Sequence, residues 1–189
     1  MSKRIALLSA AAFGALVLTA VVAPVSAQDK MMSGEKTVMV GGAAMFPSKN
    51  IIQNAVNSKD HTTLVAAVKA AGLVGTLEGK GPFTVFAPTN AAFGKLPAGT
   101  VDTLVKPENK ATLTKILTYH VVAGKLEASS LTDGKKLKTV EGEDLTVKKS
   151  GDKVMIVDAK GGSSTVTISN VNQSNGVIHV VDTVLMPAS

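Results

Sequence analysis

The residues of this chain that could carry out acid–base or nucleophilic chemistry are its three histidines, His61, His120 and His179, and a few carboxylates. His179 lies three residues before Asp182, which could form part of a Ser-His-Asp arrangement. On a strand, however, an odd separation places two side chains on opposite faces. The chain also lacks the G-x-S-x-G sequence that holds a nucleophilic serine on a tight turn. We therefore expect no catalytic residues, and we interpret His179 as a strand histidine and Asp182 as a hydrogen-bonded carboxylate.

The same residue types offer no metal or cofactor site. The histidines lack the H-x-x-x-H and H-E-x-x-H spacings that bring two zinc ligands together. There is no cysteine, which removes thiolates as ligands and disulfides as crosslinks. Glu141, Glu143 and Asp144 resemble a solvated hairpin tip and lack the alternating ligands of a calcium loop. Gly79 and Gly81 lack the third glycine and the helix of a dinucleotide site, so we expect neither a metal nor a cofactor.

The polar pair Tyr119 and His120 is the most interesting in the chain. His120 lies on the apolar face of a helix predicted to start at Pro107, together with Leu113 and Ile116. Polar side chains on such a face usually bond to the backbone inside the core. We interpret the pair as buried and hydrogen-bonded in preference to a pair of ligands.

The elements that position these residues are helical in the first half of the chain. Residues 50–57 carry apolar side chains at helical spacing, and residues 60–63 can cap a second helix that ends at Gly72, where a left-handed residue is needed. Residues 100–105 form another short helix in this prediction. The helix that starts at Pro107 follows it and continues to His120.

The second half has the pattern of strands. A short buried strand is already predicted at 83–86; it ends at Pro88, and Thr89 can cap the next helix. Beyond His120, β-branched runs alternate with glycine-containing turns; they span residues 136–140, 144–148, 154–157, 165–170 and 177–185. A helical half followed by an antiparallel half predicts an α+β domain.

The N-terminus predicts export. Two basic residues precede an uncharged run over residues 5–23, and small residues lead up to Ala27. That run could span a bilayer as a retained anchor, but its small-residue ending favours a signal peptide, residues 1–27, cut after Ala27. Residues 28–46 are polar and rich in Gly and Met, so we expect a flexible leader. The domain then covers residues 47–187, and no stable membrane insertion is expected after cleavage.

The charge and the aromatic content narrow the choice of partners. The formal charge of +6 falls to +4 when Lys3 and Arg4 are removed, and the remaining lysines are scattered along the sequence. The chain has five Phe, one Tyr and no Trp, so it lacks the aromatic platforms that stack on bases or flat sugars. Without a basic stripe in the sequence we expect no nucleic-acid binding. We expect a monomer.

Three ordered motifs resemble those of the fasciclin (FAS1) domain. They are the stretch 83–93, FTVFAPTNAAF; the stretch 119–122, YHVV; and the stretch 175–182, NGVIHVVD. The resemblance covers about residues 47–187. It implies an α+β fold, a β-sandwich or wedge with a bundle of short helices packed on one side, in which the first and last motifs form neighbouring strands. It also implies an exported or cell-surface adhesion protein without catalytic activity.

The resemblance also implies candidate partner-binding residues. In animal members, the residues before the Asn-Gly-Val motif and around the Tyr-His pair are implicated in integrin binding. By motif these positions are Asn170, Val171, Tyr119 and His120 in this chain. Those members carry Asp-Ile where this chain has Asn170 and Val171, so the carboxylate that could complete an integrin's metal site is missing.

These observations predict an exported, non-enzymatic module of the periplasm or cell surface that binds a cell-surface protein, matrix or polysaccharide partner. An alternative is a periplasmic small-ligand-binding protein or minor enzyme with a pocket between helices and sheet. Such a pocket would need an apolar cavity with converging polar groups.

Overall fold

A mixed sheet of seven strands organises residues 36–188, the part of the chain that this computed structural model describes. The strand order is β4-β3-β9-β8-β7-β6-β5. β3 and β9, which carry the first and last motifs, are parallel neighbours, and all other pairs in the sheet are antiparallel. The strands are β3 Phe83–Pro88, β4 Val121–Ala123, β5 Lys136–Lys138, β6 Asp144–Ser150, β7 Lys153–Val157, β8 Ser163–Gln173 and β9 Gly176–Val181.

The sheet curls until its two edges meet. Val122 of β4 forms an isolated antiparallel bridge with Thr139, which lies just beyond β5. The connection between β5 and β6 fixes Thr139, because the Thr139 hydroxyl donates to the Glu143 carbonyl at 2.8 Å. The result is a nearly closed wedge, as expected for this α+β domain.

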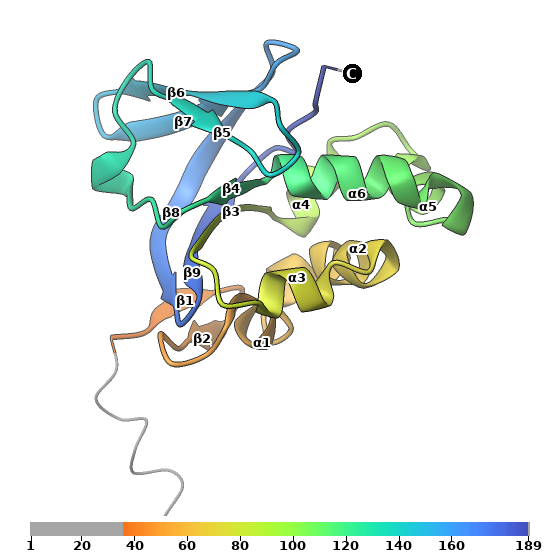
Figure 1. Ribbon diagram of the computed structural model, residues 1–189, viewed down its shortest axis with the longest axis horizontal. Helices are drawn as coiled ribbons and strands as arrows, with labels where there is room; N and C mark the ends of the chain where they lie inside the picture. The colour runs from red at the N-terminus through yellow and green to blue at the C-terminus, as the bar shows by residue number, and fades with distance from the viewer. Residues whose placement is uncertain (1–35, 189) are drawn as a thin grey trace, which may run out of the picture. The chain divides into compact units, whose positions relative to one another are not determined.

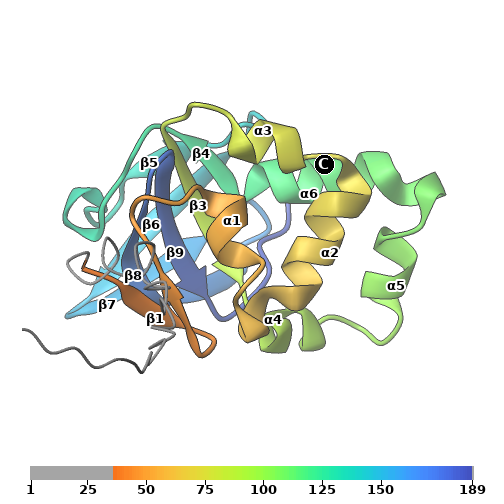
Figure 2. The same cartoon turned by 90° about the horizontal axis from the view of Figure 1, so that it is seen from below.

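Short helices cover one side of this wedge (Figures 1 and 2). The sequence predicted most of them but missed the 3-10 helix η3 and also α3, a five-residue helix that contains a glycine. The helices are α1 Ile51–Ala55, η1 Lys59–His61, α2 Thr62–Ala71, α3 Val74–Glu78, α4 Asn90–Gly94, α5 Thr100–Leu104, η2 Pro107–Asn109, α6 Lys110–Tyr119 and η3 Ala128–Ser130.

The expected leader does not extend to residue 46. Two short antiparallel strands, β1 Val38–Val40 and β2 Ala43–Met45, form a hairpin within it. Val40 and Met45 are buried in the same core cluster as Ile51 of α1, and burial of these side chains offsets the cost of ordering the hairpin. The signal peptide, residues 1–27, and residues 28–35 of the leader lie outside the described residues.

The caps at the helix ends are partly local and partly tertiary. As predicted, Gly72 is left-handed with φ of 74°, and the Thr89 hydroxyl accepts from the Ala92 N–H at 3.2 Å to cap α4. The start of α2, by contrast, is capped from a distant part of the chain. The amide oxygen of Asn90 accepts from the Thr63 N–H at 3.0 Å, so the first motif joins α4 to α2.

The apolar residues form two cores, one on each side of the β3–β9 pair. The larger core lies between the helices and the sheet and includes Leu64, Val68 and Ile116. The smaller core fills the inside of the wedge, where Phe86 and Tyr119 are buried among strand residues. The Tyr-His pair therefore follows α6 at the junction of the two cores.

The turn before β9 is fixed by Asn175, whose side chain is buried. Its amide nitrogen donates to the carbonyls of Leu77 at 2.7 Å and Gly79 at 2.9 Å, and its oxygen accepts from the Ile51 N–H at 3.1 Å. At the next position, any Cβ would collide with the Phe83 carbonyl, so the parallel strands can approach only because a glycine is there.

We expect Asn175→Ala to lower the free energy of unfolding by about 2 kcal/mol, because three backbone groups lose their partner and two of these hydrogen bonds are buried. Urea unfolding followed by circular dichroism measures this change. Ser174→Ala is the matched control, since Ser174 is exposed and should change stability by less than about 0.5 kcal/mol. Equal effects of the two substitutions would contradict the role assigned to Asn175.

Candidate functional site

Tyr119 is fully buried in the wedge core. It is the last residue of α6, and its hydroxyl reaches the opposite side of the wedge. The hydroxyl oxygen accepts from the Ala159 N–H at 2.9 Å and donates to the Asp144 carbonyl at 3.5 Å. Tyr119 thus connects the end of α6 to the β5–β7 part of the sheet, and it has no surface for a partner.

His120 is the adjacent buried residue and faces the core beneath the helices. Its Nδ1 donates to the Ile116 carbonyl at 2.8 Å, and its Nε2 accepts from the Leu185 N–H at 2.9 Å. These two bonds fix the neutral tautomer with the proton on Nδ1. Burial lowers the pKa of His120 to about 4, although the Ile116 carbonyl and the charge of Asp158 act in the opposite direction.

Removing only the hydroxyl, by Tyr119→Phe, is expected to lower the free energy of unfolding by about 1–2 kcal/mol, because the Ala159 N–H loses its partner while the ring stays in place. Thermal unfolding gives the change in Tm. Retention of the variant on cells is measured in parallel. An unchanged Tm with lost retention would show that the hydroxyl acts in binding and not in folding.

Asn170 and Val171 lie where β8 is irregular. The register of β8 against β9 shifts on both sides of Ile168, and Asn170 has a left-handed backbone with φ of 56°, which asparagine tolerates better than most residues. Its side-chain oxygen accepts from the Ala128 N–H at 2.7 Å. Val171 is buried in the core beneath the helices.

Burial changes the interpretation of the four candidate partner-binding residues. Tyr119, His120 and Val171 are each at most 2% exposed, so their side chains cannot contact a partner while the domain is folded. Asn170 is partly accessible, but its amide is used to hold the η3 segment. The observed contacts of all four side chains belong to the scaffold, and the binding role that the resemblance implied for this region stays a prediction.

His179 does not form a catalytic pair with Asp182. Its Nε2 donates to the Leu126 carbonyl at 2.7 Å, and its Nδ1 accepts from the Asn170 N–H at 3.4 Å. The ring also stacks on Phe86, with 5.7 Å between ring centroids. Both nitrogens are therefore occupied by backbone groups, as the interpretation of a strand histidine requires.

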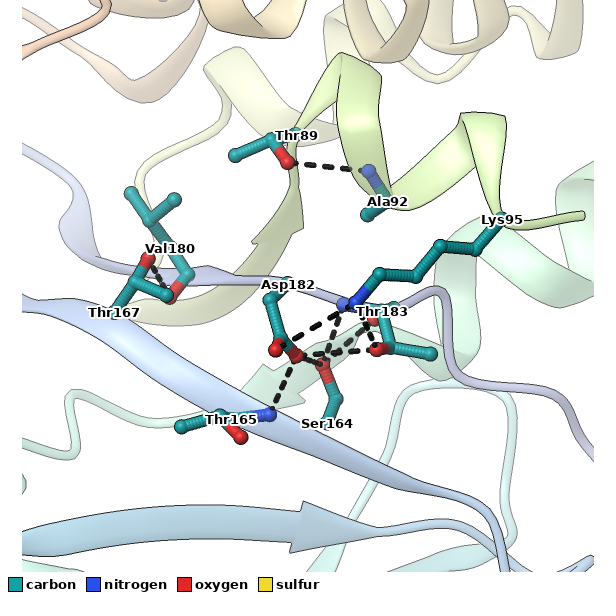
Figure 3. Close-up of polar contacts among 9 residues, drawn as sticks. All are labelled: Thr89, Ala92, Lys95, Ser164, Thr165, Thr167, Val180, Asp182 and Thr183. Atoms are coloured by element: carbon teal, nitrogen blue, oxygen red, sulfur yellow. Dashed lines mark hydrogen bonds and ion pairs between the residues drawn. The ribbon is translucent and has the colours of Figure 1, made fainter.

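Asp182 is the centre of a separate polar cluster just after β9 (Figure 3). Its Oδ1 accepts from the Thr165 N–H at 2.8 Å and the Thr183 hydroxyl at 3.1 Å. Ser164 donates to the same oxygen at 3.4 Å, and Lys95 Nζ lies 3.6 Å from Oδ2. Burial acts to raise the pKa of Asp182, but the hydrogen bonds from Thr165 and Thr183, together with Lys95, lower it overall. The carboxylate holds β8, β9 and the end of α4 together.

Within residues 36–188, no set of three or more histidine and carboxylate side chains is placed to hold a metal ion. None of the helices in the same range is long and apolar enough to cross a membrane. The residues that sequence reasoning missed are the bridging amides Asn90 and Asn175. Both residues lie in the fasciclin-like motifs, and this position was the one sign in the sequence that they matter. Their hydrogen-bond partners could not be predicted, because they are distant in sequence.

A cavity of about 40 Å³ lies between the helices and the sheet. Its walls are apolar except for Ser58, His61 and His120. Ser58 Oγ and His61 Nδ1 are 2.9 Å apart, whereas His61 Nε2 has no partner with hydrogen-bond geometry among residues 36–188. Burial lowers the pKa of His61, against the opposing effects of the Ala87 carbonyl and Asp60. The histidine is therefore neutral near pH 7.

The curled sheet, the parallel pairing of its two motif strands and the layer of short helices together define a fasciclin-like α+β domain. The chain belongs to this family: the fasciclin domain family matches residues 59–187. Among solved structures, the chain is similar to a FAS1 domain pair from the insect cell adhesion molecule Fasciclin I, with a TM-score of 0.66 and 17% identity. The match covers 75% of this chain and 52% of that one, and it bears on the fold alone.

Bacterial relatives are much more similar in sequence. The chain is 47% identical over 176 residues to Protein sll1483 of Synechocystis sp., which covers 93% of this chain and 94% of that protein. It is 41% identical over 153 residues to Cell surface glycolipoprotein MPB83 of Mycobacterium bovis, covering 78% and 64%. It is 40% identical over 138 residues to Immunogenic protein MPB70 of the same species, covering 70% and 66%.

Proposed function

We propose that this protein is an exported, non-enzymatic adhesion module that binds a partner at the cell surface. The observation that carries the proposal is its likeness to a relative named as a cell surface glycolipoprotein, 41% identical over 78% of this chain. The use of polar side chains supports it, since Tyr119, His120, His179 and Asp182 all bond to groups of the domain itself. A partner of such a domain would therefore bind to its outer surface.

The alternative, a carrier of a small ligand, depends on the cavity beneath the helices. Ligand pockets are usually about 300–1,000 Å³, and an apolar cavity that binds benzene measures about 150 Å³. At about 40 Å³, this cavity could take such a ligand only if the helices moved away from the sheet. The size of the cavity therefore favours the adhesion module.

Retention of the exported protein on intact producing cells and on their extracellular polysaccharide tests the proposal. We expect folded protein to be retained and heat-unfolded protein to be lost or bound without saturation. Absence of saturable retention on every surface would contradict adhesion. Native mass spectrometry of the same sample tests the alternative, because a carrier would show a bound small molecule that unfolding releases.

A further inference from the structure

The outer face of β5, β6 and β7 is rich in lysine. Side chains alternate across these strands, so the buried residues Leu137, Leu145, Val147, Val154 and Ile156 face the wedge core. The alternate positions on the other face include the exposed lysines Lys136, Lys138, Lys148 and Lys153. This part of the sheet lies at the end of the domain away from α1 and α3 (Figure 1), and its outward lysines are exposed.

The strand register places these four lysines along one diagonal. Lys138 and Lys136 are successive outward residues of β5, and Lys136 is opposite Thr146 of β6. Lys148 is the next outward residue along β6, and Lys153 lies one outward position further, on β7 opposite Ser150. Successive members are about 7–8 Å apart between Cα atoms, from strand geometry. We call Lys138, Lys136, Lys148 and Lys153 the lysine stripe.

Few carboxylates offset this charge. The only outward acidic residue within β5, β6 and β7 is Asp144, opposite Lys138. Of the acidic residues in the β5–β6 turn, Glu141 lies 3.5 Å from Lys115 Nζ and Glu143 accepts from the Ala188 N–H at 2.8 Å. Asp152 lies at the β6–β7 turn, at one end of the stripe. The four lysines make no ion pair within the described residues, so their charge is available to a partner.

The chemistry of this face indicates the kind of partner. No aromatic residue lies on these strands, so bases could not stack as single-stranded nucleic acids require. Its apolar residues, Met155 and Val157, are half-buried, whereas a membrane-binding face needs apolar side chains that protrude. A row of flexible ammonium groups, without the planar fork of arginine, suits carboxylates spaced along a polymer.

We propose that the lysine stripe binds linear acidic polysaccharides along its diagonal. This inference rests on the proposed function, because it names the class of partner and the surface that an adhesion module of this kind would use. Binding of this type depends on charge in an extended line, and it weakens steeply with salt because the ammonium groups are exposed.

The test compares two variants of the exported chain with the same change in charge. The stripe variant carries Lys136→Gln, Lys138→Gln, Lys148→Gln and Lys153→Gln. The control variant carries Lys59→Gln, Lys69→Gln, Lys80→Gln and Lys106→Gln, which remove four exposed lysines from the helical side. Affinity is measured on immobilised alginate, a linear polyuronate, with neutral dextran as the blank, over a series of NaCl concentrations. Unchanged Tm values confirm that both variants fold.

We expect the wild type to bind alginate and not dextran. The stripe variant should bind alginate about tenfold more weakly or worse, with a shallower dependence on salt. The affinity of the control variant for alginate should stay within about twofold of the wild type. Equal losses in the two variants, or no loss in the stripe variant, would overturn the inference. So would stripe-dependent binding to phosphatidylserine vesicles or to DNA without binding to alginate.

Both variants are also tested for retention on cells, which separates the two proposals. Cell retention that survives the stripe substitutions would leave the adhesion function standing and refute the stripe as its surface. Stripe-dependent alginate binding without any retention of the wild type on cells would support the stripe as a polysaccharide site and contradict the adhesion function.

Discussion

Replacing His120 by alanine is expected to lower the free energy of unfolding by about 3–5 kcal/mol. The substitution removes a fully buried ring and leaves a cavity between the two cores. It also leaves the Leu185 N–H and the Ile116 carbonyl without the partner they have at 2.9 and 2.8 Å. Urea unfolding at pH 7.5 measures the change.

Two further variants make this prediction specific. His120→Gln should lose less stability than His120→Ala, because an amide can replace part of the hydrogen bonding. Thr112→Ala, at an exposed position of the same helix, should change stability by less than about 0.5 kcal/mol. A loss below about 1 kcal/mol for His120→Ala would show that the tertiary link from α6 to Leu185 contributes little.

Acid is expected to destabilise the domain between pH 6.5 and about 4. The pKa of His120 is about 4 in the folded protein, whereas the ordinary value for a solvent-exposed histidine, as in the unfolded chain, is 6.5. Below pH 6.5 the unfolded chain therefore binds a proton that the folded domain does not bind. The stability from the neutral ring is therefore complete above pH 6.5 and is lost as the pH falls towards 4. The loss from this one group reaches about 3 kcal/mol.

The physical cause is visible at Nε2 of His120. Protonation would place an N–H of the ring directly against the Leu185 N–H, at a buried site. Burial lowers the pKa values of His61 and His179 as well, so these groups add to the loss in the same direction. Asp182 acts in a lower range, since its pKa lies below 3.8 and its contribution is lost only as the pH falls past that value.

Urea midpoints measured from pH 7.5 to pH 4 test this prediction. The wild type should lose stability throughout the lower part of this range. His120→Gln, although less stable at pH 7.5, should show a shallower dependence on pH because the titrating ring is gone. A wild-type stability that stays constant from pH 7 to pH 4.5 would contradict the assignment of His120 as neutral and buried.

Features that depend on neighbouring residues could be predicted before the fold was known. Gly72 ends α2 because a left-handed residue is needed there, and Thr89 caps α4 through an N–H three residues away. The strand segments follow from alternation of β-branched residues, and the fasciclin-like motifs predicted that the first and last motif strands are neighbours. Burial of Tyr119 and His120 also followed from their place on an apolar helix face.

Features that depend on long-range pairing follow only from the three-dimensional fold. The hairpin β1–β2 is ordered by a core formed from distant residues, and the cap of α2 comes from Asn90, 27 residues away. Val171 is a core residue because the register shifts in β8 determine which side chains of that strand face inward. The lysines appear scattered in the sequence, and only the register of β5, β6 and β7 aligns four of them. Local patterns fix which elements form, but strand register fixes which side chains meet.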